Sequence, residues 1–263
     1  MARLHHEVLG SDAAPTALVG FTHGIFGSGS NWRSIARQVM ARRPGWGAVL
    51  IDLRLHGRSE AGDPPHTVAA CAADVAALVA SLTPRVDALV GHSFGGKVVL
   101  AQDAVARRIV LDASPSPGRD WDAEGNSVRA AWESMAALDR VWPRRDDYVA
   151  ALIGRGHAAP LANWLAMNLI ATDGGLRLRL DLAAIRALLD DYGAVDLWPR
   201  VEDPGVGPLH VVVAGRGGIV SAADLARLAR AAHVTTTVVP DAGHWLHLDA
   251  AAAVVDAIVA ALP

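Results

Sequence analysis

Residues 91–97 read Gly-His-Ser-Phe-Gly-Gly-Lys and lie between an apolar run at 86–91 and a helix-like segment. They contain the pattern G-x-S-x-G, in which a serine sits on a tight turn from a strand into a helix. A match to the pattern alone arises by chance in roughly one chain in ten of this length. The stronger evidence is its position between a predicted strand and a predicted helix. Glycines at 91 and 95 would let strand and helix approach where a Cβ would clash. We therefore expect Ser93 to be a nucleophile, against the plainer alternative that it only caps a helix.

Other short apolar runs occur on both sides of this turn. They span residues 3–9, 16–22, 46–51, 108–112, 208–214 and 234–240, and helical patterns such as 68–82 lie between them. Strands without polar alternation that are joined by helices predict a doubly wound, mostly parallel sheet of about seven to eight strands, the α/β class. Ligands of such sheets bind at the carboxyl ends of the strands.

The alternation of strand and helix breaks between residues 113 and 205. This stretch has helix-like segments, few strand signals and five of the eight tryptophans, namely Trp121, Trp132, Trp142, Trp164 and Trp198. We expect a helical cap at 113–205, inserted into a core domain formed by 1–112 and 206–263. Most of these indoles should fill the cap's own core, and one or two should line an apolar pocket over Ser93.

Composition excludes several classes of protein. The chain has 263 residues, is 52% hydrophobic and 19% charged, and carries a net charge of −3 without a basic face for nucleic acid. The unbroken run Ala250 to Val255 is too short to span a bilayer, and the N-terminus lacks an apolar export segment, so we expect a soluble cytoplasmic protein without a membrane span. Cys71 is the one cysteine and is expected in a helix core. No metal-binding motif is present, and we expect no metal.

Four short motifs occur in order along the chain. They are His-Gly-Ile-Phe-Gly-Ser at 23–28, Asp-Leu-Arg-Leu-His-Gly-Arg-Ser at 52–59, the 91–97 stretch, and Ala-Gly-His-Trp at 242–245. In these motifs the chain resembles the α/β-hydrolase superfamily, within it the small esterase and thioesterase branch. The resemblance implies a cofactor-free serine esterase that acts on esters or thioesters with a hydrophobic acyl group. The residue types at 52–59 suggest a hydrogen-bonded loop brace and not catalytic groups.

A hydrolase of this plan needs an oxyanion hole and a base. The backbone amides of Ile25 and Phe94 are the expected oxyanion donors. His244, in the loop after the 234–240 run, is the expected base, and His247 is the weaker alternative. From the apolar residues near these positions, we expect substrate contacts from Phe26, Trp132, Trp164 and Trp245.

The acid of the triad departs from the commonest superfamily pattern. That position follows the 208–214 strand, but residues 211–220 contain no carboxylate, and Asp224 comes only within a predicted helix capped by Ser221. Asp112 ends the 108–112 strand, and the resemblance offers this as an alternative acid position. A carboxylate there can orient the imidazole and stabilise its charged form. We expect Asp112 to be the acid and keep Asp224 as the alternative.

Other functions remain compatible with the sequence. C–C bond hydrolysis or a lyase reaction could use the same triad, and a binding protein could carry an idle one. Gly91 with Gly96 and Lys97 also approaches a phosphate-binding P-loop, although Val98 stands where a hydroxyl residue would ligate Mg²⁺. An Asp nucleophile, as in related dehalogenases, is disfavoured because Ser93 occupies the turn.

Overall fold

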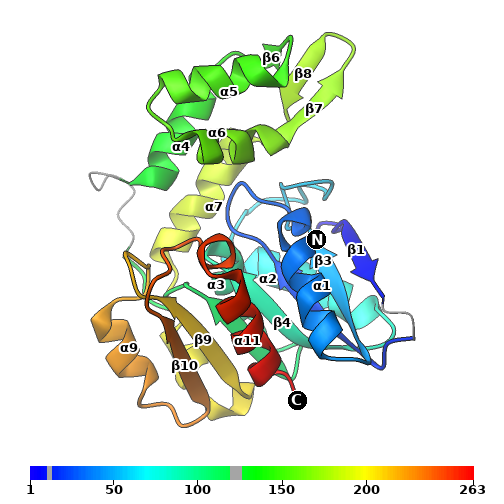
Figure 1. Cartoon of the computed structure of the whole chain (residues 1–263), viewed down its shortest axis with the longest axis vertical. Helices are drawn as coiled ribbons and strands as arrows, with labels where there is room; N and C mark the ends of the chain where they lie inside the picture. Colours follow the sequence, from blue (N-terminus) through cyan, green and yellow to red (C-terminus); the bar gives the residue numbers. More distant parts are fainter. Residues whose placement is uncertain (11–13, 119–125) are drawn as a thin grey trace.

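A seven-stranded sheet forms the centre of the computed structural model, which describes residues 1–10, 14–118 and 126–263. The strand order is β1-β3-β2-β4-β5-β9-β10, and all neighbours are parallel except β1 and β3 (Figure 1). The strands are β1 His6–Leu9, β2 Ala17–Thr22, β3 Trp46–Ile51, β4 Val86–His92, β5 Arg107–Leu111, β9 Leu209–Ala214 and β10 Val234–Val239. Each of the seven apolar runs is one of these strands. The predicted α/β class and mostly parallel sheet are therefore confirmed.

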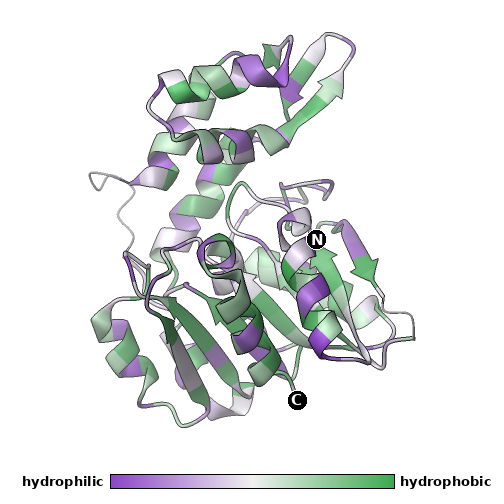
Figure 2. Cartoon of the chain, viewed as in Figure 1, coloured by the Kyte–Doolittle hydropathy of each residue, from purple (hydrophilic) through white to green (hydrophobic). Residues whose placement is uncertain are grey.

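Helices cover both faces of this sheet, which is why its central strands are apolar throughout. Helices α1 (Arg33–Arg42) and α11 (Ala251–Ala261) pack together on one face, and α2 (Val68–Ser81) and α3 (Phe94–Leu100) pack on the other. Figure 2 shows hydrophobic strands in the middle and helices that are hydrophobic on one side and hydrophilic on the other. The described residues contain no helix long and apolar enough to cross a membrane.

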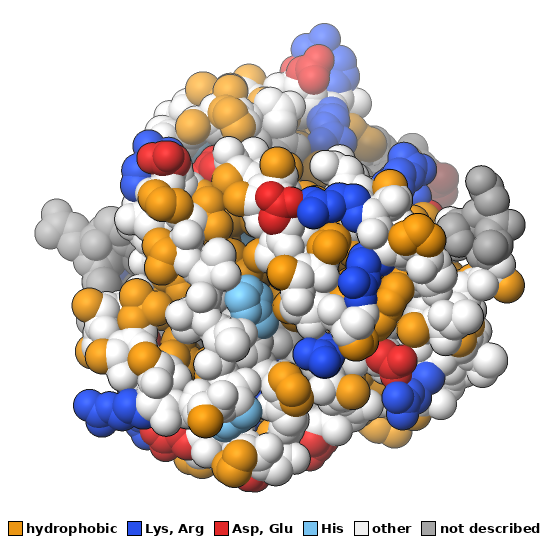
Figure 3. Space-filling model, turned by 60° about the horizontal axis from the view of Figure 1, so that its bottom comes forward, with side chains coloured by type: hydrophobic (Ala, Val, Ile, Leu, Met, Phe, Trp, Pro, Cys, Tyr) orange, Lys and Arg blue, Asp and Glu red, His pale blue; other side chains and the backbone are white. Residues whose placement is uncertain are grey.

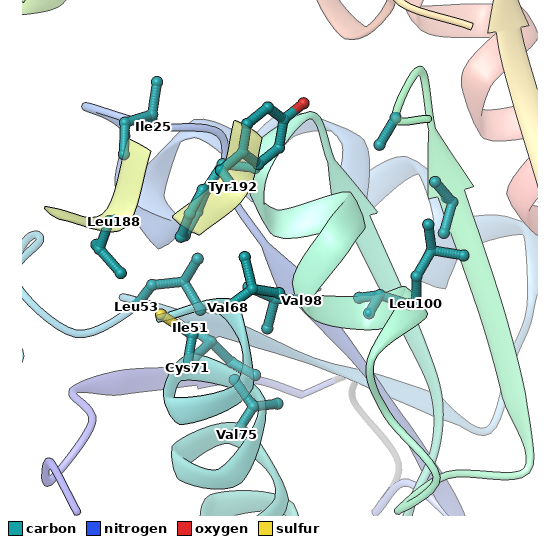
Figure 4. Packing of buried hydrophobic residues seen from close by; sticks show 14 of the residues in the cluster. Ile25, Ile51, Leu53, Val68, Cys71, Val75, Val98, Leu100, Leu188 and Tyr192 are labelled. Atoms are coloured by element: carbon teal, nitrogen blue, oxygen red, sulfur yellow. The ribbon is translucent and has the colours of Figure 1, made fainter. Parts of the chain in front are cut away.

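Helix α2 shows how local sequence sets these elements. Thr67 caps the helix by accepting a hydrogen bond of 3.0 Å from the amide of Ala70. Cys71 points into the core beside Val75 and Val68 (Figure 4). Burial raises the pKa of its thiol to about 12, so Cys71 is a small core residue.

Residues 127–194 form a lobe above the carboxyl edge of the sheet (Figure 1). Its elements are α4 Ser127–Ala136, β6 Val141–Trp142, α5 Arg145–Gly154, α6 Ala159–Leu165, the 3-10 turn η2 Ala166–Asn168, β7 Leu169–Thr172, β8 Gly175–Leu178 and α7 Leu182–Ala194. Besides the expected helices, the lobe contains a small antiparallel sheet in the order β6-β8-β7, which the sequence did not indicate. Gly175 allows the close pairing, since a Cβ there would lie 2.6 Å from the carbonyl oxygen of Trp142.

The lobe does not coincide with the expected insertion at 113–205. Leu188 and Tyr192 of α7 join the core cluster that includes Ile25 and Val98 (Figure 4). After α7, helix α8 (Trp198–Glu202) and the turn η3 (Pro204–Val206) return to the core, where Glu202 pairs with Arg227 of α9 (Ala222–Leu228) at 2.6 Å. Trp121, expected in the cap, lies outside the described residues.

The charged side chains are mixed on the face shown in Figure 3. Lys and Arg side chains there are interspersed with Asp, Glu and hydrophobic side chains, and they do not gather into one basic patch on that face.

Candidate active site

Ser93 stands on a sharp turn between β4 and α3. Its backbone has φ 53° and ψ −116°, a conformation that non-glycine residues rarely adopt. The glycines make the turn possible: a Cβ on Gly91 would lie 2.3 Å from the carbonyl oxygen of Gly95, and a Cβ on Gly95 would lie 2.5 Å from that of His23. This is the strand, turn and helix that a nucleophile elbow requires.

Lys97 excludes the P-loop interpretation of the same residues. Its ammonium is buried and donates to the carbonyl oxygens of Ser116 at 2.9 Å and Tyr192 at 2.8 Å. A P-loop lysine instead reaches the phosphates of a nucleotide. Since α3 also begins at Phe94, no open four-residue loop separates Gly91 from Gly96. The nucleotide-binding alternative is therefore wrong.

His244 lies between Ser93 and Asp112, in the loop that joins β10 to the short helix α10 (Leu246–Asp249). Its Nε2 is 3.0 Å from Ser93 Oγ, and its Nδ1 is 2.7 Å from Asp112 Oδ2. Because a carboxylate only accepts, the Nδ1–H donates to Asp112 and Nε2 is left to accept the Ser93 hydroxyl proton. The structure thus brings the three expected triad residues into one chain of hydrogen bonds.

Asp112 directly follows β5 and is fully buried, with φ 44°. Besides His244, it accepts the amide of Ala214 at 3.3 Å and the amide of Ile219 at 3.0 Å. Both amides belong to the end of β9 and the loop after it, the segment in which the sequence offered no carboxylate. The end of β9 and the loop after it therefore donate hydrogen bonds to the carboxylate of Asp112, which follows the neighbouring strand β5.

Asp224, the alternative acid, has different partners. It accepts the hydroxyls of Ser114 at 3.0 Å and Ser116 at 2.6 Å, and the amide of Ser221 at 3.0 Å. Burial by itself would raise its pKa, but these hydrogen bonds, led by that from Ser116, lower the pKa overall. Asp224 therefore caps α9 and fastens the chain that leaves β5, and the structure does not bring it to His244.

Of the two expected oxyanion donors, Ile25 lines both cavities described below, and Phe94 lines the smaller of them; Ser93 lies in the wall of both. Phe94 is the first residue of α3, so its amide has no acceptor within the helix. Among the described residues, neither amide donates a hydrogen bond to another protein group. Two unused donors beside a nucleophile are what an oxyanion hole requires.

Two buried histidines hold the loop that contains Ile25. His56 Nε2 accepts the amide of Phe26 at 3.2 Å, and His23 Nε2 accepts the amide of Leu53 at 3.0 Å. Burial, together with the neighbouring His23, lowers the pKa of His56 to about 3. The ring therefore stays neutral and keeps the lone pair that accepts this hydrogen bond.

The 52–59 segment forms the brace that its residue types suggest. Asp52 accepts the amides of Gly29 at 2.7 Å and Arg58 at 2.8 Å, and the Ser59 hydroxyl donates to the Asp52 carbonyl oxygen at 2.6 Å. Arg54 forms a buried ion pair of 2.6 Å with Asp74 of α2. These contacts tie the loops after β2 and β3 together below the site.

Sequence reasoning missed the role of His92. Its Nε2–H donates to the carbonyl oxygen of His244 at 2.7 Å, and the two rings pack against each other, tilted by 35°, with centroids 4.7 Å apart. Burial and the neighbouring His244 and His247 hold the pKa of His92 well below its ordinary value. The only sequence signal was its place before Ser93, a position that the G-x-S-x-G pattern leaves open.

His247, the weaker candidate for the base, lies in α10. Its ring packs against those of Trp32 and His92, with centroids 5.1 Å and 4.8 Å away. Burial and then the neighbouring His244 lower its pKa to about 4. The structure places this ring behind the site, away from Ser93.

Two cavities meet at Ser93 and His244. The larger, about 310 Å³, lies between the lobe and the core; the smaller measures about 160 Å³. The larger one is lined mainly by apolar groups, among them Ile25, Phe26, Val128, Ala131, Leu161, Trp164, Trp245 and Leu248. The smaller one has a more polar wall, with Asn126 and Tyr192, and Ser127 lines both cavities. Among the described residues, no group of three or more His, Cys, Asp or Glu side chains is arranged to hold a metal ion.

Of the four expected substrate contacts, Phe26, Trp164 and Trp245 line the larger cavity. The two indoles meet edge to face, with centroids 4.9 Å apart. Trp132 does not line either cavity. Its indole N–H donates to the Leu182 carbonyl oxygen at 2.8 Å, and its ring packs on the lobe's core. The expectation for Trp132 is corrected accordingly, because an indole that closes the α4–α7 contact does not face substrate.

Comparison with known proteins identifies the family. The chain matches the alpha/beta hydrolase family over residues 21–257. It is 30% identical to mouse sn-1-specific diacylglycerol lipase ABHD11 over 98% of this chain and 85% of that protein. It is also 24% identical to a putative esterase/lipase of Haemophilus influenzae, over 89% and 79% of the two chains.

Solved structures agree in fold. A marine microorganism esterase superposes with a TM-score of 0.85 at 21% identity over the whole of both chains. The E-2-(acetamidomethylene)succinate hydrolase superposes with a TM-score of 0.76 at 25% identity, over 98% of this chain and 94% of that one. These structures share the fold. The family match and the 30% identical relative confirm the prediction of a carboxylic ester hydrolase, and the chain belongs to the alpha/beta hydrolase family.

Proposed function

We propose that the protein hydrolyses carboxylic esters or thioesters that carry a hydrophobic acyl group, with Ser93 as nucleophile, His244 as base and Asp112 as acid. One observation carries the proposal: a continuous chain of hydrogen bonds, 2.7 Å and 3.0 Å long, runs from Asp112 through His244 to Ser93 where two cavities meet. The ester preference is supported by the lipase and esterase names of the relatives.

The proposed reaction proceeds in two halves. Ser93 Oγ bonds to the carbonyl carbon while its proton passes to His244 Nε2, and Asp112 stabilises the imidazolium that forms. The oxyanion accepts from the amides of Ile25 and Phe94. Collapse breaks the bond to the leaving alcohol or thiol, which takes the proton from His244. His244 then deprotonates a water molecule, which attacks the carbonyl carbon of the acyl-enzyme. The ester bond to Ser93 breaks, the carboxylic acid product leaves, and Ser93 Oγ takes the proton back from His244. The cycle needs no cofactor.

The two cavities suggest which part of the substrate binds on each side of Ser93. Burial of an acyl chain is favoured by about 25 cal/mol per Å² of apolar surface, so the larger cavity, with Leu161 and Trp164 in its wall, suits the acyl group. The smaller cavity has the more polar wall, which includes Asn126 and Tyr192, and this suits the alcohol or thiol portion.

A panel of p-nitrophenyl esters from acetate to decanoate, with matched acyl thioesters, tests this proposal. We expect kcat/KM to rise with acyl length until the larger cavity is filled. Ser93→Ala should lose turnover while keeping the wild-type melting temperature. Folded wild-type protein that turned over neither esters nor thioesters, or a Ser93→Ala variant of full activity, would overturn it. Turnover of a C–C bond substrate in preference to every ester would favour the other chemistry that this triad supports.

A further inference from the structure

The residue after the expected oxyanion donor Ile25 is strained. Phe26 has φ 63°, in the left-handed region that a bulky residue avoids. Such a conformation persists only when its surroundings hold it there. The direction of the Ile25 amide depends on this same short loop, so whatever holds Phe26 also sets the oxyanion hole.

Phe26 is held from two sides. From the core, His56 Nε2 accepts its amide at 3.2 Å. From the lobe, the side-chain amide of Asn168 donates to its carbonyl oxygen at 2.8 Å. Both backbone groups of the strained residue are therefore fixed, one by each part of the molecule.

Asn168 is built for this contact. It ends the turn η2, is 5% exposed, and its Nδ2 donates to Leu165 O at 3.2 Å as well as to Phe26 O. Since both partners are carbonyl oxygens, only the NH₂ end of the amide satisfies them. The backbone carbonyl of Asn168 in turn accepts the amide of Arg179 at 2.9 Å, which fastens η2 to the strand pair β7–β8.

Neighbouring lobe residues contact the other loops of the site. Trp164 meets Trp245, which follows the base His244. The Arg179 guanidinium donates to the carbonyl oxygen of Gly57 in the brace segment. The lobe segment α6–η2 and the residue after β8 thus touch three of the loops that form the site.

We propose that Asn168 is a positioning residue for the oxyanion hole: by holding the Phe26 carbonyl, the lobe keeps the Ile25 amide aimed at the reacting carbonyl oxygen. This inference rests on the proposed function, because it takes Ile25 as an oxyanion donor. The juxtaposition makes the lobe part of the catalytic arrangement as well as a wall of the cavity.

Two substitutions test this role. Asn168→Leu has nearly the same size and removes the donor, and Asn168→Asp also places a carboxylate against two carbonyl oxygens. Asn163→Leu is the matched control, because Asn163 lies in the same lobe segment and donates to Ala159 O at 2.9 Å, away from the oxyanion loop. Each variant is assayed for kcat and KM on one p-nitrophenyl ester, for its melting temperature, and for inhibition by a trifluoromethyl ketone, whose adduct carries an oxyanion.

We expect Asn168→Leu to lower kcat about tenfold, a part of the 10²–10³ lost with a whole donor. KM should stay within about twofold, the ketone's Ki should rise in parallel with the loss of kcat, and Asn168→Asp should lose more. Asn163→Leu should resemble wild type. A folded Asn168→Leu variant with wild-type kcat and Ki, changed only in melting temperature, would overturn the inference. Wild-type protein without esterase activity would instead overturn the proposed function.

Discussion

The carboxyl edge of the sheet and the lobe differ in where they hold backbone strain. Among the described residues, the non-glycine residues with positive φ are Phe26, Leu55, Ser93 and Asp112. Each lies in the loop after one of four adjacent strands, β2, β3, β4 and β5. In the lobe, the described residues with positive φ are glycines, Gly156 and Gly175. Strain of this kind survives only where surrounding contacts fix it, so the sheet edge is the part of the fold organised for chemistry.

The two regions also differ in how they use charge. At the sheet edge, Arg54 and Asp74 form an ion pair with side chains 3% and 0% exposed. In the lobe, the Arg144–Asp147 pair joins side chains 74% and 32% exposed. Buried partners depend on each other, whereas exposed partners are solvated with or without the pair. We therefore expect substitutions at the edge to change catalysis and stability. In the lobe, we expect substitutions in the cavity wall to change selectivity, whereas Asn168, which contacts the oxyanion loop, acts on kcat.

The largest expected effect is a difference in turnover between variants of two core carboxylates, Asp112 and Asp224. Asp112→Asn keeps the size of the side chain but no longer stabilises the imidazolium, and turnover should fall about 10⁴-fold. Asp224→Asn, which loosens the Ser114 and Ser116 contacts, should keep kcat within a few-fold of wild type. Steady-state kinetics on one ester measures both. Comparable losses in the two variants would refute the assignment of the acid.

The next effect compares the two ion pairs. Arg54→Met leaves Asp74 charged and buried without its partner, and the free energy of unfolding should fall by about 3 kcal/mol. Arg144→Met in the lobe should leave the free energy of unfolding unchanged, because that guanidinium is exposed. Urea denaturation followed by circular dichroism checks both. Equal stability of the two variants would remove the contrast between edge and lobe.

The third effect concerns selectivity. Ala131 of α4 is buried in the wall of the larger cavity, and its neighbour Ala130 is exposed. Ala131→Phe should lower the ratio of kcat/KM for octanoyl over acetyl esters about tenfold, the scale of discrimination by a few methylenes. Ala130→Phe serves as the control and should keep the wild-type ratio. An unchanged ratio in Ala131→Phe would mean that the acyl group lies elsewhere.

The fourth effect, similar in size to the third, is a pH dependence of stability that arises from a histidine behind the site. His247 has a pKa of about 4 in the folded protein, below the roughly 6.5 of an unfolded chain. Between these values the unfolded state binds more protons, so the free energy of unfolding should fall as pH drops from about 6.5 toward 4. His247→Phe keeps an aromatic ring against Trp32 and cannot be protonated, and it should lose roughly 1–2 kcal/mol less than wild type between pH 7 and 5. Identical pH dependence in the two proteins would exclude His247 as a source.

The sequence predicted the sheet well because buried parallel strands are continuous apolar runs bounded by turn residues. It also indicated Ser93 and His244, since both follow strands and belong to short motifs. Asp112 was accessible for a similar reason: the carboxyl ends of parallel strands share one edge, so a carboxylate there is a candidate wherever it falls in the chain.

The lobe was harder to predict. Strand β6 has two residues, and β7 and β8 are half exposed. None of the three therefore shows the clear hydrophobic pattern of a buried strand. Trp132 resembled the indoles that line the cavity, because composition does not say which way a ring faces. Asn168 contacts a residue 142 positions away, and no local pattern reveals such a partner.

The proposed mechanism requires that Asp112 and His244 activate Ser93. Intact-mass spectrometry after brief exposure to a fluorophosphonate probe tests it most directly, with wild type and Ser93→Ala treated side by side. We predict one adduct on the wild type and none on Ser93→Ala. A folded wild type that stays unlabelled, or a Ser93→Ala variant labelled to the same extent, would contradict the account.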